Sequence, residues 1–293
     1  MTIGLWRVQA GDRIQLARGD SADGPADLLD PSFTVASMLA DPGGPLQLLE
    51  SLPGFGPVPA AADVLAPLDL QPVWAAGVTF PRSREARREE AIDGGDVYDR
   101  VFAASRPELF VKAAPGAAIG TGGQLGIRAD SGWDVPEPEL CVVADPQGRA
   151  QALVLGNDVS SRSIEGENPL YLPQAKVYDL SCGVGPCLVP LSLAPPWHEL
   201  RIGVRIARGG AVLYEDEMQL AAMRRTPEEL LSWLFAAHSF PQGVALLTGT
   251  SLVPPSEVTL RAGDVVAISS DELGALEHTI VTVGVRLGDQ SAP

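Results

Sequence analysis

A pair of glutamates set between prolines constrains this chain most, in the segment Trp133-Asp134-Val135-Pro136-Glu137-Pro138-Glu139-Leu140. Proline on both sides of Glu137 excludes a helix interior and favours an extended backbone. Successive side chains of an extended chain alternate between two faces, so Glu137 and Glu139 are expected to point the same way. The apolar run from Leu140 to Val143 indicates a strand that enters a core. The sequence therefore predicts two carboxylates held close together where a buried strand begins.

Such a pair needs a partner that neutralises it. Like charges at short range repel unless a shared proton or a cation intervenes, and all-oxygen ligands are what hard divalent ions prefer, Mg²⁺ above all. A Glu-x-Glu pair on its own is more often a solvated strand face, because acidic side chains are mostly exposed. The neighbouring segments decide between these two interpretations.

Two later segments add an aspartate and a lysine. An apolar run from Leu153 to Leu155 leads into Asn157-Asp158, which puts Asp158 at the end of a predicted strand. Lys176 stands alone between apolar neighbours. A lysine desolvated near a cation loses proton affinity and can act as a base, whereas a surface lysine is the alternative if Lys176 is considered by itself.

Six motifs in one order resemble the fumarylacetoacetate hydrolase superfamily. They hold their order and spacing over roughly residues 70 to 285, and they are Arg106 to Lys112 (RPELFVK), Glu137-Pro138-Glu139, Asn157 to Arg162 (NDVSSR), Lys176, Gly183 to Pro186 (GVGP) and Thr248-Gly249-Thr250. Each motif alone is weak, but six in register identify the chain as a member. The resemblance implies a mainly β, α+β fold, a mixed β-roll of stacked sheets with peripheral helices. It also implies a homodimer or homotetramer.

The resemblance also implies a metal site. Its matching positions Glu137, Glu139 and Asp158 would hold Mg²⁺, with Mn²⁺ or Ca²⁺ as alternatives. Asp179, three residues after Lys176, is a further candidate that would join the metal shell or orient the lysine, with capping of a loop as its alternative.

Position 83 departs from the family's hydrolases. Ser83 stands where they carry a histidine that activates water for C–C cleavage, and the three histidines of this chain lie elsewhere. Hydrolysis is therefore disfavoured. Arg82 and Ser83 become candidates for binding the hydroxyls or the carboxylate of a substrate, since arginine makes bidentate contacts to carboxylates; a surface salt bridge is the alternative for Arg82. Thr250 matches a family threonine that contacts the substrate carboxylate.

Longer matches resemble one subgroup, the 2-keto-3-deoxy-sugar-acid dehydratases. The most specific runs from Glu165 to Lys176, and others cover Asp99 to Phe110 and Ser131 to Glu139. The resemblance implies an enzyme, a metal-dependent lyase that converts a small 2-keto acid, a 2-keto-3-deoxy-pentonate such as 2-keto-3-deoxyarabinonate, to 2,5-dioxopentanoate. The alternatives are acylpyruvate or fumarylacetoacetate-type hydrolysis or oxaloacetate decarboxylation, and ligand binding without turnover.

Dehydration needs one base and one acid. The metal ion would polarise the keto group and stabilise an enolate after a C3 proton is removed, and the C4 hydroxyl would leave with a proton from an acid. Lys176 is assigned to C3 deprotonation or substrate positioning and Glu108 to the loss of the hydroxyl, with the two roles exchangeable. Glu108 begins an apolar run after Pro107, where burial would keep its carboxyl protonated enough to donate. A strand-edge carboxylate is its alternative.

Composition narrows the class of protein. The net charge of −16 over 293 residues disfavours nucleic-acid binding, because no basic patch neutralises phosphates. No apolar run has the length of a membrane span, and the N-terminus lacks the order of a signal peptide. Three cysteines form an odd set without metal-site spacing. We therefore expect a cytoplasmic protein with reduced thiols, no membrane contact and a small-molecule substrate.

The chain divides into a small N-terminal domain (1–68) and a catalytic domain (69–293). In the first, Trp6–Val8 and Arg13–Ala17 are expected to pair across the Gly11-Asp12 turn. The remaining predicted elements are a helical segment from Leu46 to Leu52, helices from Ser83 to Ile92 and from Pro227 to Ala237, and two strands that pair within Val258–Ile268.

Overall fold

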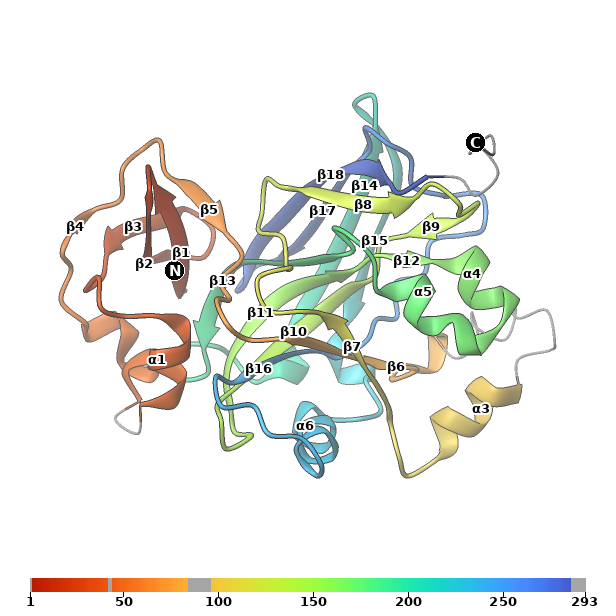
Figure 1. Ribbon diagram of the computed structural model, residues 1–293, viewed down its shortest axis with the longest axis horizontal. Coiled ribbons are helices and arrows are strands. Elements are labelled where there is room, and N and C mark those ends of the chain that lie inside the picture. Colours follow the sequence, from red (N-terminus) through yellow and green to blue (C-terminus); the bar gives the residue numbers. More distant parts are fainter. Residues whose placement is uncertain (1, 42–43, 84–95, 286–293) are drawn as a thin grey trace, which may run out of the picture.

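Strands predominate in the computed structural model, which describes residues 2–41, 44–83 and 96–285 of the chain (Figure 1). The strands are β1 (Ile3–Ala10), β2 (Arg13–Asp20), β3 (Gly24–Leu28), β4 (Gly56–Pro57), β5 (Asp63–Leu65), β6 (Val73–Gly77), β7 (Glu108–Ala113), β8 (Gln124–Arg128), β9 (Asp134–Val135), β10 (Pro138–Ala144), β11 (Ala150–Asp158), β12 (Ser160–Ser161), β13 (Cys182–Pro190), β14 (Arg201–Arg208), β15 (Ala211–Gln219), β16 (Val244–Leu247), β17 (Val265–Ser270) and β18 (Gly274–Val283). The α-helices are α1 (Val35–Ala40), α3 (Asp96–Ala103), α4 (Arg162–Glu167), α5 (Leu172–Lys176) and α6 (Pro227–Phe235), and the 3₁₀ helices are η1 (Pro45–Ser51), η2 (Pro169–Tyr171), η3 (Trp197–Glu199) and η4 (Leu220–Ala222).

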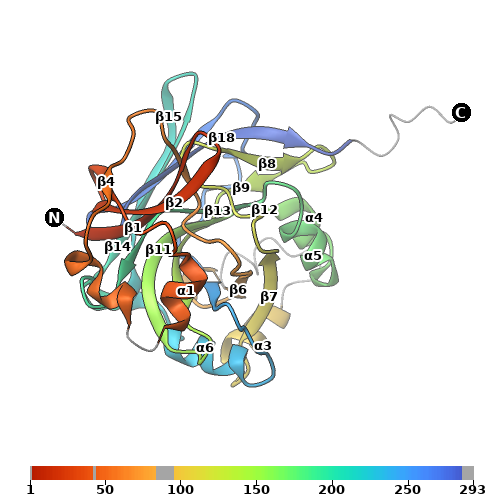
Figure 2. The same ribbon diagram turned by 60° about the vertical axis from the view of Figure 1, so that its left-hand side comes forward.

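Two large mixed sheets form the body of the protein. The larger has the order β4-β3-β2-β1-β13-β11-β10-β16-β6-β7, with β5 paired to β1, and the smaller has the order β15-β14-β17-β18-β8. The short helices lie around the sheets, and α4 and α5 lie together at one side of the molecule in both views (Figures 1 and 2). This mainly β architecture with peripheral helices confirms the predicted fold class.

The centre of the larger sheet is buried on both faces, which explains its continuous apolar runs. On β10, Leu140 and Val142 pack in the core shared with the smaller sheet, while Cys141 and Val143 pack in a second core on the opposite face. A strand covered on both sides cannot show an apolar and polar alternation. The predicted strand from Leu140 to Val143 is therefore confirmed, and its two faces lead to different surroundings.

The N-terminal region extends the larger sheet. Strands β1 and β2 form the predicted hairpin, with Ala10 opposite Arg13, and the predicted helical segment is the 3₁₀ helix η1. Leu5 of β1 pairs with Leu188 of β13, and Leu5 packs in the same core as Cys141. Residues 1–68 thus share a sheet and a core with the rest of the chain, and an independent domain with its boundary at residue 68 stays a prediction.

Of two elements predicted in the C-terminal third of the chain, the helix is confirmed and the strand pair is wrong. Helix α6 is confirmed, and its N-cap Thr226 accepts a hydrogen bond from the Glu229 amide at 3.2 Å. The strand pair within Val258–Ile268 is wrong, because the segment before β17 is irregular and β17 pairs with β14 and β18. The buried Asp264 carboxylate accepts a hydrogen bond of 2.8 Å from the Arg261 amide. This hydrogen bond closes a turn where the prediction had a strand.

The predicted helix from Ser83 to Ile92 lies almost entirely outside the described residues. Within the described part of the chain, no helix combines the length and the apolar character that crossing a membrane requires.

Candidate active site

Three carboxylates come together at the end of the β10 and β11 pair. Glu139 lies opposite Gly156 in the register of the two antiparallel strands, and the Asp158 amide donates to the Glu137 carbonyl at 3.0 Å. Alternation puts residues 137 and 139 of one strand and residue 158 of the other on the same face of the sheet. All three side chains are buried, and one carboxylate oxygen from each lies within 4.8 Å of the others. The predicted same-face geometry is therefore observed.

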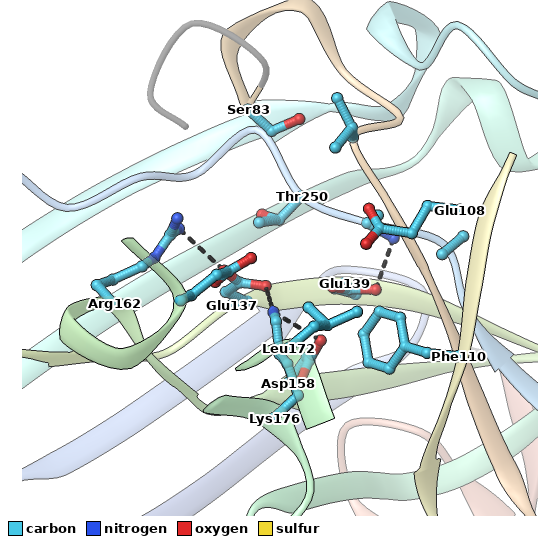
Figure 3. A pocket seen from close by; sticks show the side chains of 15 residues that line it. Ser83, Glu108, Phe110, Glu137, Glu139, Asp158, Arg162, Leu172, Lys176 and Thr250 are labelled. Carbon is cyan, nitrogen blue, oxygen red and sulfur yellow. Dashed lines mark hydrogen bonds and ion pairs between the residues drawn. The ribbon is translucent and has the colours of Figure 1, made fainter. Parts of the chain in front are cut away.

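Two buried lysines, Lys112 and Lys176, pair with this cluster, and Figure 3 shows Lys176 beside Glu137 and Asp158. Lys176, the last residue of α5, places its Nζ 2.5 Å from Glu137 Oε2 and 2.9 Å from Asp158 Oδ2. Lys112 on β7 places its Nζ 2.6 Å from Asp158 Oδ1 and donates to the backbone carbonyls of Val159 and Lys176 at 3.0 and 2.5 Å. One ammonium thus connects β7, the end of β11 and the end of α5.

An arginine holds the remaining oxygen of Glu137. Arg162 is the first residue of α4, the helix whose N-cap Ser161 accepts a hydrogen bond from the Ile164 amide. Its Nη2 lies 2.9 Å from Glu137 Oε1, and both side chains are almost fully buried. Glu137 therefore has one cation on each oxygen, Arg162 from the start of α4 and Lys176 from the end of α5.

The electrostatics of the cluster distinguish its members. Burial raises the pKa of Glu139 well above its usual value, and the charges of Asp158 and Glu137 raise it further. Burial also opposes the ionisation of Asp158, but the ammonium groups of Lys112 and Lys176 outweigh it and lower the pKa of Asp158. A divalent cation bound beside Glu139 would therefore favour its ionised form.

A glycine turn supplies the backbone contact to Glu139. The Gly249 amide donates to Glu139 Oε2 at 2.6 Å. Gly249 has a φ of +90°, and an added Cβ would lie 2.1 Å from Thr79 Oγ1, so only glycine fits this turn. Thr250, the next residue, is buried and lines the pocket, and its Oγ1 accepts a hydrogen bond from the Leu252 amide at 3.0 Å.

Glu108 begins β7 as predicted and faces the cluster across the pocket (Figure 3). It is half-buried and lies opposite Gly77 of β6, whose missing side chain makes room for the carboxyl group: a Cβ on Gly77 would lie 2.0 Å from Glu108 Oε2. Val78, the next residue, lines the pocket with a φ of 54°. A branched residue in this region is strained, at a cost on the order of 1–3 kcal/mol, and such strain concentrates at functional sites.

Ser83 and Arg82 were both predicted to bind the substrate, but only Ser83 is among the described residues that line the pocket. Ser83 lines the pocket, and its Oγ donates to the Phe80 carbonyl at 2.8 Å. Arg82 is exposed and is not among the described pocket-lining residues; its charge acts on the phenol of Tyr214. A role for Arg82 in substrate binding therefore lacks support from its position.

Asp179 lies apart from the three carboxylates. It is exposed, it lies outside the carboxylate cluster, and it lines a different hollow with Tyr178 and Ser181. The chain leaves α5 at Lys176 and turns at Leu180, whose φ is 60°. Asp179 lies outside the cluster before this turn is reached, so its position gives no support to its predicted role as a metal ligand.

Sequence reasoning assigned no role to several pocket or cluster residues. Lys112 is the last residue of the motif Arg106–Lys112, Arg162 is the last residue of Asn157–Arg162, and Glu165 begins the match from Glu165 to Lys176. The charge of each residue and its position in these motifs could have identified it as a candidate. The lining of the pocket also contains Phe110 and Leu172. These apolar side chains limit the water around Lys176, whose Nζ lies 5.9 Å from the Phe110 ring centroid.

The residues present fit a hard divalent cation. Three buried carboxylates provide oxygen ligands within 4.8 Å of one another, and the raised pKa of Glu139, caused by burial and by its acidic neighbours, is what a bound cation would reverse. Magnesium is consistent with this donor set.

Comparisons with known proteins support the same conclusion. The model of the family described as "Fumarylacetoacetate (FAA) hydrolase C-terminal" matches residues 98–281. A protein of Haloferax volcanii named "Probable 2-keto-3-deoxyxylonate dehydratase" is 47% identical over 218 residues, 74% of each chain. The "2-dehydro-3-deoxy-D-arabinonate dehydratase" of Saccharolobus solfataricus is 38% identical over 216 residues, 73% of this chain and 72% of that one.

A solved structure extends the similarity to nearly the whole chain. It is described as 2-keto-3-deoxy-D-arabinonate dehydratase complexed with magnesium and 2,5-dioxopentanoate, and it superposes with a TM-score of 0.81 at 29% identity over 98% of this chain and 100% of that one. The predicted magnesium-type cofactor agrees with this neighbour and with the carboxylate cluster. The chain is an enzyme, as predicted, and it belongs to the fumarylacetoacetate hydrolase family.

Proposed function

We propose that this protein catalyses the magnesium-dependent dehydration of a 2-keto-3-deoxy-pentonate, such as 2-keto-3-deoxyarabinonate, to 2,5-dioxopentanoate. One observation carries the proposal: a single pocket contains the three-carboxylate cluster, Lys176 and Glu108, and a serine at position 83. The pocket thus offers a cation site and two groups for proton transfer. It offers no histidine among its described lining residues, so a base for hydrolysis at position 83 is missing.

Glu137, Glu139 and Asp158 would hold the cation, which when bound supplies a Lewis acid for the keto and carboxylate oxygens of a 2-keto acid. Lys176 contacts Glu137 and Asp158. Its ammonium group would therefore lie near C3 of a 2-keto acid bound at the cation site. Glu108 lies across the pocket, on the side from which a departing hydroxyl could be protonated. The reaction removes one proton from C3 and hydroxide from C4. A proton shift from C5 to C3 then gives the C4=C5 enol, and transfer of the enol O–H proton to C4 gives 2,5-dioxopentanoate.

The remaining residues position the reacting groups. Lys112 holds Asp158 and the backbone of Lys176, and Arg162 holds Glu137, so the rotamers of the cluster are fixed before substrate arrives. Phe110 and Leu172 exclude water from the lysine side of the pocket. A homodimer or homotetramer stays part of the proposal.

The direct test uses purified protein with Mg²⁺ and 2-keto-3-deoxyarabinonate or 2-keto-3-deoxyxylonate, with 2,5-dioxopentanoate detected by its dehydrogenase. We expect turnover that a chelator abolishes and Mg²⁺ restores. Acetylpyruvate, assayed in parallel, is expected to be a poor substrate. Hydrolysis of acetylpyruvate at a rate equal to or above dehydration would favour the alternative, a C–C hydrolase.

A further inference from the structure

Three hydrogen-bond donors of one turn contact the sulfur atom of Met218. This methionine lies near the end of β15, is 3% exposed and packs in the core that the two large sheets share. Its Sδ lies 3.4 Å from the amide nitrogen of Ser251, 3.4 Å from the hydroxyl oxygen of Ser251 and 3.7 Å from Oγ1 of Thr250, and all three groups donate to it. A thioether sulfur is only a weak acceptor, and packing in an apolar core requires none of these contacts.

The turn after β16 is held by both sheets. Thr248 is fixed to the larger sheet, because its amide and its hydroxyl both donate to the Leu140 carbonyl, at 3.0 and 2.9 Å. In the described part of the chain, the recorded hydrogen bonds that join Thr250 and Ser251 to another element all end at Met218. The smaller sheet therefore holds, through one sulfur atom, the part of the turn that lies beyond the anchors on the larger sheet.

The hydroxyl of Thr250 has a defined polarity in this arrangement. Its oxygen accepts a hydrogen bond from the Leu252 amide at 3.0 Å, while its proton is directed to Met218 Sδ. Thr250 also lines the pocket that contains the carboxylate cluster. A carboxylate oxygen is a much stronger acceptor than a thioether sulfur, so the carboxylate of a ligand in this pocket would take over the proton. The sulfur thus keeps the donor in place without holding it strongly.

We infer that Met218 is a positioning residue for the substrate: its sulfur holds the turn so that Thr250 donates a hydrogen bond to the carboxylate of a bound 2-keto acid. The inference rests on the proposed function, because it takes the pocket to bind 2-keto acids at the cation site. Met218 itself is not among the described residues that line the pocket. It acts through Thr250.

Met218→Leu tests the inference, because it removes the acceptor and nearly conserves the volume of the side chain. The carboxylate of the substrate does not react, so a lost contact to it weakens ground-state and transition-state binding equally, which raises KM and leaves kcat unchanged. We expect KM for 2-keto-3-deoxyarabinonate to rise about tenfold, the effect of one hydrogen bond to a charged group, with kcat within about twofold. Calorimetry with the Mg²⁺-loaded protein should show an equal loss of affinity for 2-oxopentanoate, which has no C4 hydroxyl to lose.

Met223→Leu is the matched control. Met223 is also buried and packs in the same core, and no hydrogen bond to its sulfur is recorded among the described residues. This variant should leave KM and the affinity for 2-oxopentanoate unchanged. The Mg²⁺ affinity should stay within about twofold in both variants, since Gly249 keeps its amide contact to Glu139; a general collapse of the site would lower it.

Two further variants show whether Met218 acts through the turn. Thr250→Val replaces the hydroxyl by a methyl group of similar shape, and in this background Met218→Leu should lower the affinity for 2-oxopentanoate by no more than about twofold. Ser251→Ala leaves Met218 in place and removes one of its three donors. It should lower the affinity by about threefold, and it provides the test if Met218→Leu does not fold.

The outcomes separate the role of Met218 from the proposed reaction. An unchanged affinity for 2-oxopentanoate in Met218→Leu (or in Ser251→Ala where the leucine variant does not fold), or an equal loss in the Thr250→Val background, would overturn the role of Met218 even if the protein dehydrates 2-keto-3-deoxy-pentonates. The expected losses of affinity in a protein that dehydrates none of these sugar acids would refute the reaction and leave the role of Met218 standing. If the Mg²⁺-loaded wild type does not bind 2-oxopentanoate, both claims fail.

Discussion

Substitution of Gly77 by alanine tests the position of Glu108 without touching a charged group. The added Cβ would lie 2.0 Å from Glu108 Oε2 and 2.7 Å from its Cδ, whereas ordinary contacts begin at 3.4 Å. The carboxyl oxygen must therefore retreat by about 1.4 Å, the difference between 3.4 and 2.0 Å. Gly77 is not among the described glycines with positive φ, so its backbone accepts alanine and the displacement of Glu108 is the main effect.

A displacement of about 1 Å at a catalytic group costs on the order of 100-fold in rate. We expect Gly77→Ala to lower kcat for 2-keto-3-deoxyarabinonate by about 100-fold, while Mg²⁺ affinity measured by calorimetry and stability in urea stay close to those of the wild type. Gly132→Ala is the control, because a Cβ there meets no atom within 4 Å. It should leave kcat unchanged.

A double variant separates an effect through Glu108 from a general one. In a Glu108→Ala background, Gly77→Ala should have no further effect, since the group that it displaces is gone. A kcat for Gly77→Ala within twofold of the wild type, or an equal loss in both backgrounds, would refute the proposed position and role of Glu108.

Three further predictions concern the cluster and a neighbouring buried acid. Glu137→Gln or Glu139→Gln should abolish both Mg²⁺ binding and turnover, and unchanged affinity in calorimetry would contradict the proposed cation site. Lys176→Met should stop the exchange of C3 hydrogens with deuterium observed by NMR, whereas Glu108→Gln should permit exchange and block loss of water; the reverse pattern would interchange the two roles. Burial raises the pKa of Asp134 to about 6, so the folded state binds this proton more strongly than the unfolded state and loses stability as the pH rises from about 4 to about 6. Asp134→Asn should therefore be more stable than the wild type at pH 8, by up to about 3 kcal/mol, and an equal difference at pH 4 and pH 8 in urea unfolding would contradict this.

Local rules predicted the parts of the site that lie on one strand or at its end. Glu137 and Glu139 follow from side-chain alternation, and Asp158 follows from the end of an apolar run. Lys112 and Arg162 could not be assigned in this way. Lys112 on β7 meets Asp158 at the end of β11 although three strands, β10, β16 and β6, lie between β7 and β11 in the sheet, and a contact of this kind depends on the tertiary fold.

The structure gives no support to two expectations that were based on local sequence. Asp179 was expected near the cluster because it is close to Lys176 in sequence, but it is exposed and lies outside the cluster. The strand pair within Val258–Ile268 was predicted from apolar residues on both sides of a glycine turn, but the buried Asp264 carboxylate accepts a hydrogen bond from the Arg261 amide and pairs with Arg208. In both places, contacts made in the folded chain determined the structure, and the local sequence pattern did not reveal them.

The segment from Arg162 to Lys176 is fastened at both ends to one residue. Arg162 contacts Oε1 of Glu137 and Lys176 contacts Oε2, while the residues in between form α4, η2 and α5. A segment anchored in this way can change its interior without moving its ends. Exchange of residues 163–175 between members of the family would then be a route, in evolution or in engineering, to a new substrate range over an unchanged set of carboxylates.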